Sequence, residues 1–333
     1  MKALVLDGIG QPVQLRDVPT PQPGPGEVLV RLQAAALNHR DVWIQKGQYA
    51  GLRFPIILGS DGAGTVAELG EGVDASLLHQ PVIIDPGQQW GDNPRAQGRS
   101  FQILGLPQNG TFAECVRVPA ANVYPRPAHL TAEQAAALPL GGVTAYRALF
   151  TRGRLQPRER VLITGIGGGV ALLALQLAVA RGAEVWVTSG TPEKIERAQT
   201  LGARGGLSYR EAGCGKALVQ LAGGPFDLII DSAAGPGVAE LLEAAAPGGR
   251  LVFYGGTTGT MTNVPPRHIF WKQLDILGST MGTAQDFAGL LELVNETKLV
   301  PIIDSVFPLA EGEQALRRMA EGEQCGKLVL RIK

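Results

Sequence analysis

The chain has 333 residues, enough for two domains, and 45% of them are hydrophobic. Lys plus Arg and Asp plus Glu number 30 each, so the charge balance gives no sign of a basic surface for nucleic acid or anionic membranes. Three widely spaced cysteines without a C-x-x-C pair exclude a disulfide framework and fit a reducing cytoplasm.

Short apolar runs occupy the first 125 or so residues, among them KALVL, EVLVRL and GTVAEL. Pro- and Gly-rich turns such as PQPGPGE separate them. This texture predicts a mostly antiparallel, partly barrel-like β domain. The longest strongly apolar run, 11 residues from Val170, is too short to cross a bilayer and predicts a buried helix. We therefore expect a cytoplasmic protein with no membrane segment.

From about Leu138 the pattern changes to strands alternating with helices. RVLITG, EVWVTS, FDLIID and GRLVFYG predict strands that are apolar throughout, which is typical of a parallel sheet covered on both faces. After about Thr283 a helix and a final strand are expected to rejoin the first domain. We accordingly assign residues 1–130 and 283–333 to one domain and residues 131–282 to a doubly wound parallel-sheet domain.

A glycine-rich turn directly follows the first of these strands, in VLITGIGGGVALLALQLA. Gly165, Gly167, Gly168 and Gly169 stand between a strand and a helix, which is the context that the dinucleotide fingerprint requires. The glycines permit a sharp turn and a close backbone approach to a pyrophosphate, and the helix N-terminus presents free N–H groups to it. The motif predicts dinucleotide binding; a purely structural glycine turn is the alternative.

The end of the second strand indicates which dinucleotide is bound. An Asp or Glu there would accept the ribose hydroxyls of NAD, but the sequence reads VWVTSGTPEK. Ser189 and Gly190 are small and uncharged, and the nearest cation is Lys194. This arrangement favours the 2′-phosphate of NADP(H), although Lys194 is equally compatible with an exposed helix position.

These features resemble the medium-chain dehydrogenase/reductase superfamily over nearly the whole length. The resemblance rests on PGPGEVLVRLQAAALNHRD, ILGSDGAGTV, GTFAECVRVPA, AAALPLGGVTAYRAL, FWKQLDILGSTMG and GKLVLRI, together with the glycine turn. Within the superfamily the chain is most similar to the quinone oxidoreductase and zinc-type alcohol dehydrogenase-like branches. The resemblance implies a GroES-like catalytic domain and a Rossmann domain, with a homodimer formed through the strand at 273–279.

The resemblance also implies a set of cofactor contacts. Tyr209 matches a tyrosine that flanks the 2′-phosphate together with a lysine matching Lys194 in the NADPH-dependent quinone reductases. His39 matches a neutral donor near the cofactor phosphates, although a satisfied loop histidine is an equally good interpretation. The remaining expected contacts are Thr144, Val170, Ser189, Gly190, Gly255, Gly256, Thr257, Ser279 and Met281.

Zinc members of the superfamily need thiolate, imidazole and a third soft or carboxylate ligand. At the matching positions this chain carries Asn38, Ser60 and Leu140, which do not make such a site. Asp61 matches an acid behind the metal, and from the sequence it is either a hydrogen-bond acceptor lining a cleft or a turn residue capped by N–H groups. We therefore expect no zinc.

Without a Lewis acid, reduction of an activated acceptor is easier than oxidation of a simple alcohol. We expect hydride transfer from NADPH to a quinone or an α,β-unsaturated carbonyl, with Asn38 and Tyr49 as candidate hydrogen-bond donors and Asp41 as an orienting residue. The alternatives are a non-catalytic NADPH-binding redox sensor or structural protein, and an alcohol dehydrogenase or aldehyde reductase with an atypical metal site.

Overall fold

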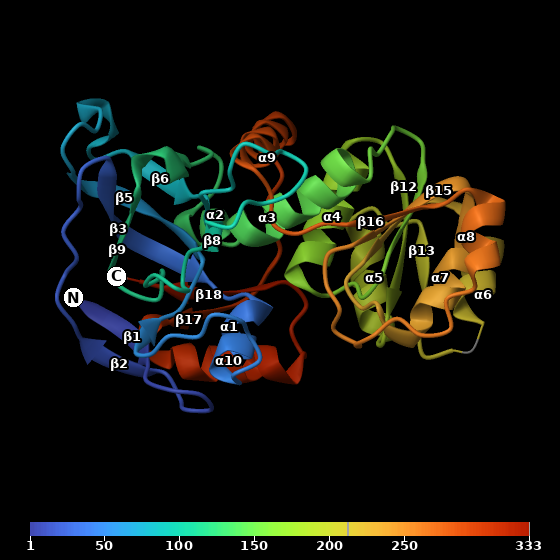
Figure 1. Ribbon diagram of the computed structural model, residues 1–333, viewed down its shortest axis with the longest axis horizontal. Coiled ribbons are helices and arrows are strands. Elements are labelled where there is room, and N and C mark those ends of the chain that lie inside the picture. The colour runs from blue at the N-terminus through green and yellow to red at the C-terminus, as the bar shows by residue number, and fades with distance from the viewer. Residues whose placement is uncertain (212, 333) are drawn as a thin grey trace. The chain divides into compact units, whose positions relative to one another are not determined.

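The computed structural model describes residues 1–211 and 213–332 and divides the chain into two compact units (Figure 1). Unit 1 comprises Met1–Gly141 and Thr283–Lys333, and unit 2 comprises Gly142–Gly282. The second boundary falls at the residue expected from the sequence, whereas the first lies at Gly141 rather than at residue 130. Helix α2 (Ala132–Ala136), which lies inside the range 131–282 assigned to the nucleotide domain, therefore belongs to unit 1.

Unit 1 is built on a seven-stranded sheet with the order β10-β6-β5-β3-β18-β17, to which β9 adds by pairing with β3. Its strands are β3 (Glu27–Ala36), β5 (Asp61–Leu69), β6 (Pro81–Ile84), β9 (Cys115–Pro119), β10 (Val123–Pro125), β17 (Ile303–Pro308) and β18 (Lys327–Arg331). A second sheet has the order β2-β1-β4, from β2 (Gln14–Asp17), β1 (Lys2–Leu6) and β4 (Ile56–Ile57). The short strands β7 (Gly87–Gln88) and β8 (Gln102–Ile103) form a separate ribbon.

The C-terminal segment returns to unit 1, as predicted. Strand β18 pairs antiparallel with β3, with Leu330 opposite Ala35, while β17 runs parallel to β18. The helices of unit 1 outside α2 are α1 (His39–Gln45), α9 (Ala284–Thr297) and α10 (Gly312–Glu321). The final strand thereby brings Lys327 beside the end of β3, next to the segment that opens α1.

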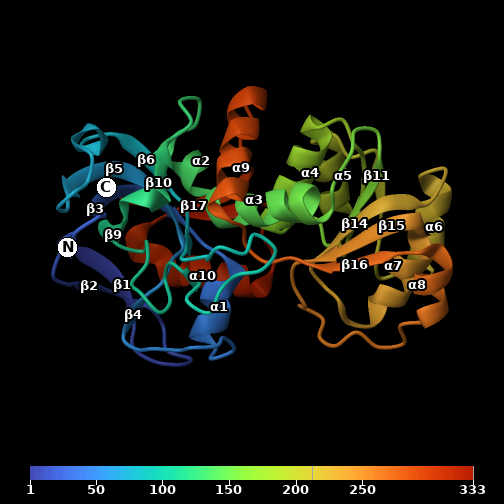
Figure 2. The same ribbon diagram turned by 45° about the horizontal axis from the view of Figure 1, so that its top comes forward.

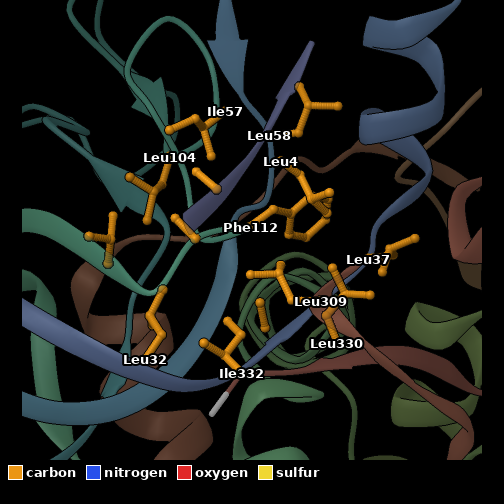
Figure 3. Close-up of a cluster of buried hydrophobic side chains, with 14 of the residues drawn as sticks. Leu4, Leu32, Leu37, Ile57, Leu58, Leu104, Phe112, Leu309, Leu330 and Ile332 are labelled. Atoms are coloured by element: carbon orange, nitrogen blue, oxygen red, sulfur yellow. The ribbon is translucent and has the colours of Figure 1, made fainter. Parts of the chain in front are cut away.

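The core of unit 1 gathers side chains from both ends of the chain (Figure 3). Leu4 of β1, Leu32 of β3, Phe112 and Leu330 of β18 are all almost completely buried. Figure 3 shows Phe112 beside Leu4, with Leu37 and Leu330 on neighbouring segments. Truncating a buried aromatic of this kind typically costs about 3–5 kcal/mol. This core holds the start of α1 and the turn before β5 in fixed positions.

Unit 2 is a six-stranded, wholly parallel sheet with the order β13-β12-β11-β14-β15-β16 (Figure 2). Its strands are β11 (Arg160–Ile163), β12 (Glu184–Ser189), β13 (Gly205–Ser208), β14 (Phe226–Asp231), β15 (Ala245–Phe253) and β16 (Asp275–Gly278). The helices are α4 (Gly169–Ala180), α5 (Pro192–Thr200), α6 (Cys214–Leu221), α7 (Val238–Ala244) and α8 (Pro266–Lys272), with α3 (Pro139–Tyr146) and a π-helical turn (Arg147–Arg152) leading in. This is the predicted doubly wound α/β architecture.

Local sequence explains these elements well. The central strands β11 and β14 are buried and apolar, which accounts for their unbroken hydrophobic runs. Helix α5 follows the N-cap residue Thr191 and has Pro192 in its first turn, where proline is well tolerated. Among the described residues, no helix is long and apolar enough to cross a membrane.

Candidate active site

The NHRD segment forms the beginning of α1. Asn38 is the N-cap residue, with extended backbone angles, and its backbone N–H donates to Asp41 Oδ2 at 2.8 Å. The carboxylate of Asp41 therefore holds the first turn from within, as in the return half of a capping box. The orienting role predicted for Asp41 is consistent with this hydrogen bond.

Asp61, the acid whose role the sequence left open, lies at the centre of a buried cluster. Its Oδ2 accepts from Asn38 Nδ2 at 2.9 Å and from Lys327 Nζ at 2.9 Å. Its Oδ1 accepts from the backbone N–H of Leu140 at 2.8 Å. Asp61 is fully buried and thus joins β5, α1, β18 and the start of α3 through charge-assisted hydrogen bonds.

Lys327 is the ammonium partner that the sequence analysis missed. Its Nζ donates to Leu37 O at 2.8 Å, to Asn38 Oδ1 at 2.7 Å and to Asp61 Oδ2 at 2.9 Å, so all three N–H groups are used. One signal was present, since GKLVL puts a single lysine at the head of an apolar strand, but its partner Asp61 lies 266 residues away. Asn38 consequently uses its amide oxygen and one N–H inside the protein, which leaves one N–H for the predicted donor role.

A second buried cation, Arg40, lies at Ser60. Arg40 Nη1 donates to Ser60 Oγ at 2.7 Å and to Leu104 O at 2.9 Å, and Ser60 Oγ donates to the same carbonyl at 2.7 Å. The guanidinium carbon is 5.1 Å from the centre of the Tyr49 ring, and Arg40 Nε approaches Tyr49 Oη at 3.5 Å. The predicted donor Tyr49 is thus oriented by a cation.

The electrostatics of this part of unit 1 follow from burial. Burial raises the pKa of Asp41 to about 6, against the opposing attraction of Arg40. Asp41 Oδ1 is buried without a hydrogen-bond partner among the described residues. The pKa of His39 is lowered, first by partial desolvation within the protein and then by repulsion from the Lys327 ammonium. Part of its side chain is nevertheless exposed. Both effects favour the neutral form of the His39 imidazole.

These residues do not fit a zinc ion. By the family resemblance of the sequence, Asn38 and Ser60 match positions of metal ligands in zinc members, and in the structure each is hydrogen-bonded to a cation, Lys327 and Arg40 respectively. Leu140 contributes only its backbone N–H to Asp61, and its side chain has no donor atom. No group of three or more His, Cys, Asp or Glu side chains suitable for a metal occurs in the part of the chain that the structure describes.

The glycine loop of unit 2 has the backbone that a pyrophosphate site requires. Gly165 and Gly167 have φ angles of +63° and +126°, which side chains with a Cβ rarely adopt. A Cβ on Gly167 would lie 2.7 Å from Lys194 Cδ, and one on Gly168 would meet nothing within 4 Å. Gly168 is the N-cap of α4, so the first N–H groups of this helix have no acceptor within it, as at helix N-termini that bind phosphate.

The predicted 2′-phosphate residues lie together beside this loop. Lys194 approaches Gly167, and a Cβ on Gly190 would lie 2.6 Å from Tyr209 Oη. Ser189 pairs with Ser208 across β12 and β13, which brings Tyr209 to the end of β12. Thr191 Oγ1 is buried without a hydrogen-bond partner among the described residues, as expected where a ligand supplies one.

The other predicted cofactor residues of unit 2 lie mostly at the same edge of the sheet. Strands β15 and β16 are parallel with Phe253 opposite Gly278, so the loops that carry Gly255, Gly256 and Thr257, and Ser279 and Met281, leave the sheet side by side. Ser279 Oγ is a further buried hydroxyl without a partner in the described chain. Thr144 is on α3, and His39 belongs to unit 1. Ligands of doubly wound sheets bind at the carboxyl ends of the strands.

Comparison with known proteins gives a consistent family. Residues 24–128 match the alcohol dehydrogenase GroES-like domain, and residues 169–296 match the zinc-binding dehydrogenase family. The chain is 36% identical to the zinc-type alcohol dehydrogenase-like protein YogA of Leptosphaeria maculans, over 96% of this chain and 95% of that protein. It is 29% identical to an acryloyl-coenzyme A reductase of Sulfurisphaera tokodaii, over 99% of this chain and 100% of the relative.

The solved structures agree. A crystal structure of an NAD-dependent alcohol dehydrogenase superposes with a TM-score of 0.94 at 37% identity, with complete coverage of both chains. The two-unit architecture, the glycine loop at the sheet edge and these full-length similarities identify the chain as an oxidoreductase of the medium-chain dehydrogenase/reductase superfamily.

Proposed function

We propose that the protein is a zinc-independent, NADPH-dependent reductase that transfers hydride to a quinone or an α,β-unsaturated carbonyl. The observation that carries the proposal is the pair of buried cations, Lys327 and Arg40, bonded to Asn38 and Ser60 at the positions of the zinc ligands. A third cation bound there would meet two positive charges instead of thiolate and imidazole. Acceptors that delocalise the incoming charge do not need that metal.

NADPH, when bound, supplies the hydride. The chain supplies the rest: the glycine loop and the N-terminus of α4 receive the pyrophosphate, and Tyr49 donates its hydroxyl to the oxygen of the acceptor. The Tyr49 ring is fixed for this role by the guanidinium of Arg40 at 5.1 Å. Asp61 and Lys327 hold Asn38 in place, since both bond to its amide.

The preference for NADPH rests on Lys194 and Tyr209. Both lie beside the glycine turns at Gly167 and Gly190, and residues 188–191 contain no acid that would repel a 2′-phosphate. Some relatives are named as NAD-dependent alcohol dehydrogenases and others as acryloyl-coenzyme A reductases, so the names alone do not choose between the two reactions. The second name describes reduction of a conjugated alkene, which is the chemistry proposed for this chain.

The test is an NADPH-consumption screen across quinones, enones and aldehydes, repeated with NADH and in the presence of a chelator. We expect turnover of quinones or enones that the chelator leaves unchanged, and a preference for NADPH. Stoichiometric zinc with alcohol oxidation that depends on it would refute the proposal. Tight NADPH binding with no turnover on any acceptor would favour a redox sensor instead.

Lys194→Ala tests the cofactor assignment separately. Loss of the ammonium should weaken NADPH binding about tenfold or more and leave NADH binding nearly unchanged, because only NADPH carries the 2′-phosphate. Lys216→Ala is the matched control, since Lys216 is an exposed lysine of the same unit paired with Glu243. Equal losses for both cofactors would contradict the assignment.

We also propose a cytoplasmic homodimer. Strand β16 is an edge strand of its sheet, and Ile276 on this strand and the adjacent Trp271 are 39% and 74% exposed. A second copy of β16 would satisfy the free edge and cover these side chains. Ile276→Lys should then give a monomer by light scattering, and an unchanged mass would argue against this edge.

A further inference from the structure

Arg40 is a buried cation without a carboxylate partner. Arg40 is only 5% exposed. No Asp or Glu in the described chain forms an ion pair with its guanidinium. Its hydrogen-bond acceptors are a hydroxyl, Ser60 Oγ, and a backbone carbonyl, Leu104 O. Burying a charge among neutral partners is costly, so such an arginine needs a reason beyond folding.

The donors of Arg40 are not all used. A guanidinium carries five N–H groups, and Nη1 serves both Ser60 and Leu104 while Nε makes only a 3.5 Å approach to Tyr49 Oη. Nη2 has no hydrogen-bond partner among the described residues and is not one of the fully buried unpaired atoms. Two N–H groups of a fixed cation therefore remain available to a ligand that reaches this surface.

The neighbouring acid attracts Arg40 electrostatically but forms no direct ion pair with it. Asp41 follows it on α1, and adjacent helical side chains point in different directions. The Asp41 carboxylate is instead turned back to Asn38 N at 2.8 Å. Asp61 is committed to Lys327, Asn38 and Leu140. No carboxylate of the described residues therefore bonds directly to the Arg40 guanidinium, and its Nη2 remains available to a ligand.

We propose that Arg40 is a catalytic residue that binds the carbonyl oxygen of the acceptor through Nη2 and stabilises it as negative charge develops. The inference rests on the proposed function and narrows its substrate class to α,β-unsaturated carbonyls whose reduction places a full negative charge on one oxygen. The oxygen would lie between Nη2 of Arg40 and the hydroxyl of Tyr49, which the guanidinium already orients. Preorganised donors of this kind act on the charge of the transition state.

The step balances as follows. The hydride carries its electron pair from the reduced nicotinamide to the β-carbon of the acceptor, and the alkene pair moves to join the α-carbon to the carbonyl carbon. The carbonyl π pair moves to the oxygen, giving an enolate that Arg40 and Tyr49 hold. A proton from water then adds to the α-carbon and the carbonyl forms again. The products are the saturated carbonyl compound and oxidised cofactor.

The first test compares the kinetics of Arg40 variants on an enone. Arg40→Gln should lower kcat/KM about 10²-fold, as when one oxyanion donor is removed. Arg40→Lys should lower it less, about tenfold, because it keeps the charge and loses the fork. The matched control is Arg117→Gln, an exposed arginine of the same unit that pairs with Glu27 and should change little. NADPH affinity, set by the glycine loop, should be the same in all four proteins.

The second test needs no turnover. 4-Nitrophenol is a planar phenol whose ionised form resembles an enolate and absorbs at longer wavelength. Near neutral pH, wild-type protein should bind it with its absorption shifted toward the ionised form, and Arg40→Gln should abolish the shift. Arg40→Lys serves both tests if Arg40→Gln does not fold.

The outcomes separate the two proposals. Enone turnover that Arg40→Gln or Arg40→Lys leaves at the level of the Arg117→Gln control overturns the role of Arg40 while the proposed function stands. No turnover on any acceptor, with a phenolate shift that depends on Arg40, refutes the proposed function and supports the anion site. A shift that is absent, or equal in wild type and variants, overturns the inference.

Discussion

Two buried cations in unit 1, Lys327 and Arg40, differ in how fully the protein satisfies their charge and their hydrogen-bond donors. Lys327 and Arg40 are 3% and 5% exposed, and they bond to Asn38 and Ser60 respectively. Lys327 spends all three N–H groups and has the carboxylate of Asp61 as a partner. The hydrogen-bond acceptors of Arg40 are all neutral, and its Nη2 has no acceptor among the described residues. A cation whose N–H groups are all bonded within the protein stabilises the fold, whereas one with unused N–H groups is able to bind a ligand.

The largest expected effect on stability comes from breaking the saturated pair. Lys327→Met would leave Asp61 as a buried charge without its cation, which should lower the free energy of unfolding by about 3–5 kcal/mol in urea denaturation. Adding Asp61→Asn should recover part of the loss, because it removes the stranded charge. If Lys327→Met lowered the free energy of unfolding by less than about 1 kcal/mol, the ion pair would not be important for stability.

Asp41 should give the next effect, through pH. Its folded pKa is about 6 against an ordinary value of 3.8, so between these values the native state binds more protons than the unfolded state. Stability should therefore fall as pH rises through that window, by about 3 kcal/mol at most. In Asp41→Asn the contribution of Asp41 should be lost and the slope should become shallower, as measured by unfolding at a series of pH values.

A matched control for that slope is Asp85→Asn. Burial raises the pKa of Asp85 to about 7, so its contribution has the same sign and extends to higher pH. The two windows overlap between pH 3.8 and about 6, so each variant should remove only its own share of the slope there, and only Asp85→Asn should flatten the part from about 6 to about 7. An unchanged profile in Asp41→Asn would mean that its carboxyl is not desolvated.

Ser60→Ala tests the hydrogen bonds of the second cation, Arg40. It removes one acceptor of Arg40 and the donor to Leu104 O, and should cost about 1 kcal/mol because Arg40 keeps its bond to that carbonyl. Ser76→Ala, at an exposed serine, is the control and should cost less. Thermal denaturation of both would measure the difference. A loss as large as that of Lys327→Met would erase the distinction between the two cations.

The smallest effect on stability is expected for Tyr49→Phe. Phenylalanine keeps the ring near the guanidinium, so the change in unfolding free energy should be within about 0.5 kcal/mol. Loss of the hydroxyl should nevertheless lower kcat on an enone about tenfold or more if Tyr49 is a donor. Unchanged kcat would reduce Tyr49 to a packing partner of Arg40.

Much of the structure of unit 2 could be predicted from the sequence alone. The glycine turn, the N-cap at Thr191 and the alternation of apolar strands with helices are local patterns, and the structure contains each of them. Tyr209 was assigned from family resemblance, and its approach to Gly190 follows from the pairing of β12 with β13. Unit 1 was less accessible, because its strands are short and its sheet joins both ends of the chain.

By itself, the sequence determined that a dinucleotide fold is present, since the glycine motif and its strand–helix context are local properties. Its family resemblance predicted that Asn38, Ser60 and Leu140 stand where zinc members carry their ligands. Only the tertiary structure decided what occupies that region instead. Lys327 reaches Asp61 across 266 residues, and Arg40 reaches Leu104 across 64, through the pairing of β18 with β3 and the core around it. The balance of buried charge depends on distances that no local pattern encodes, because hydrogen bonds and desolvation act through space.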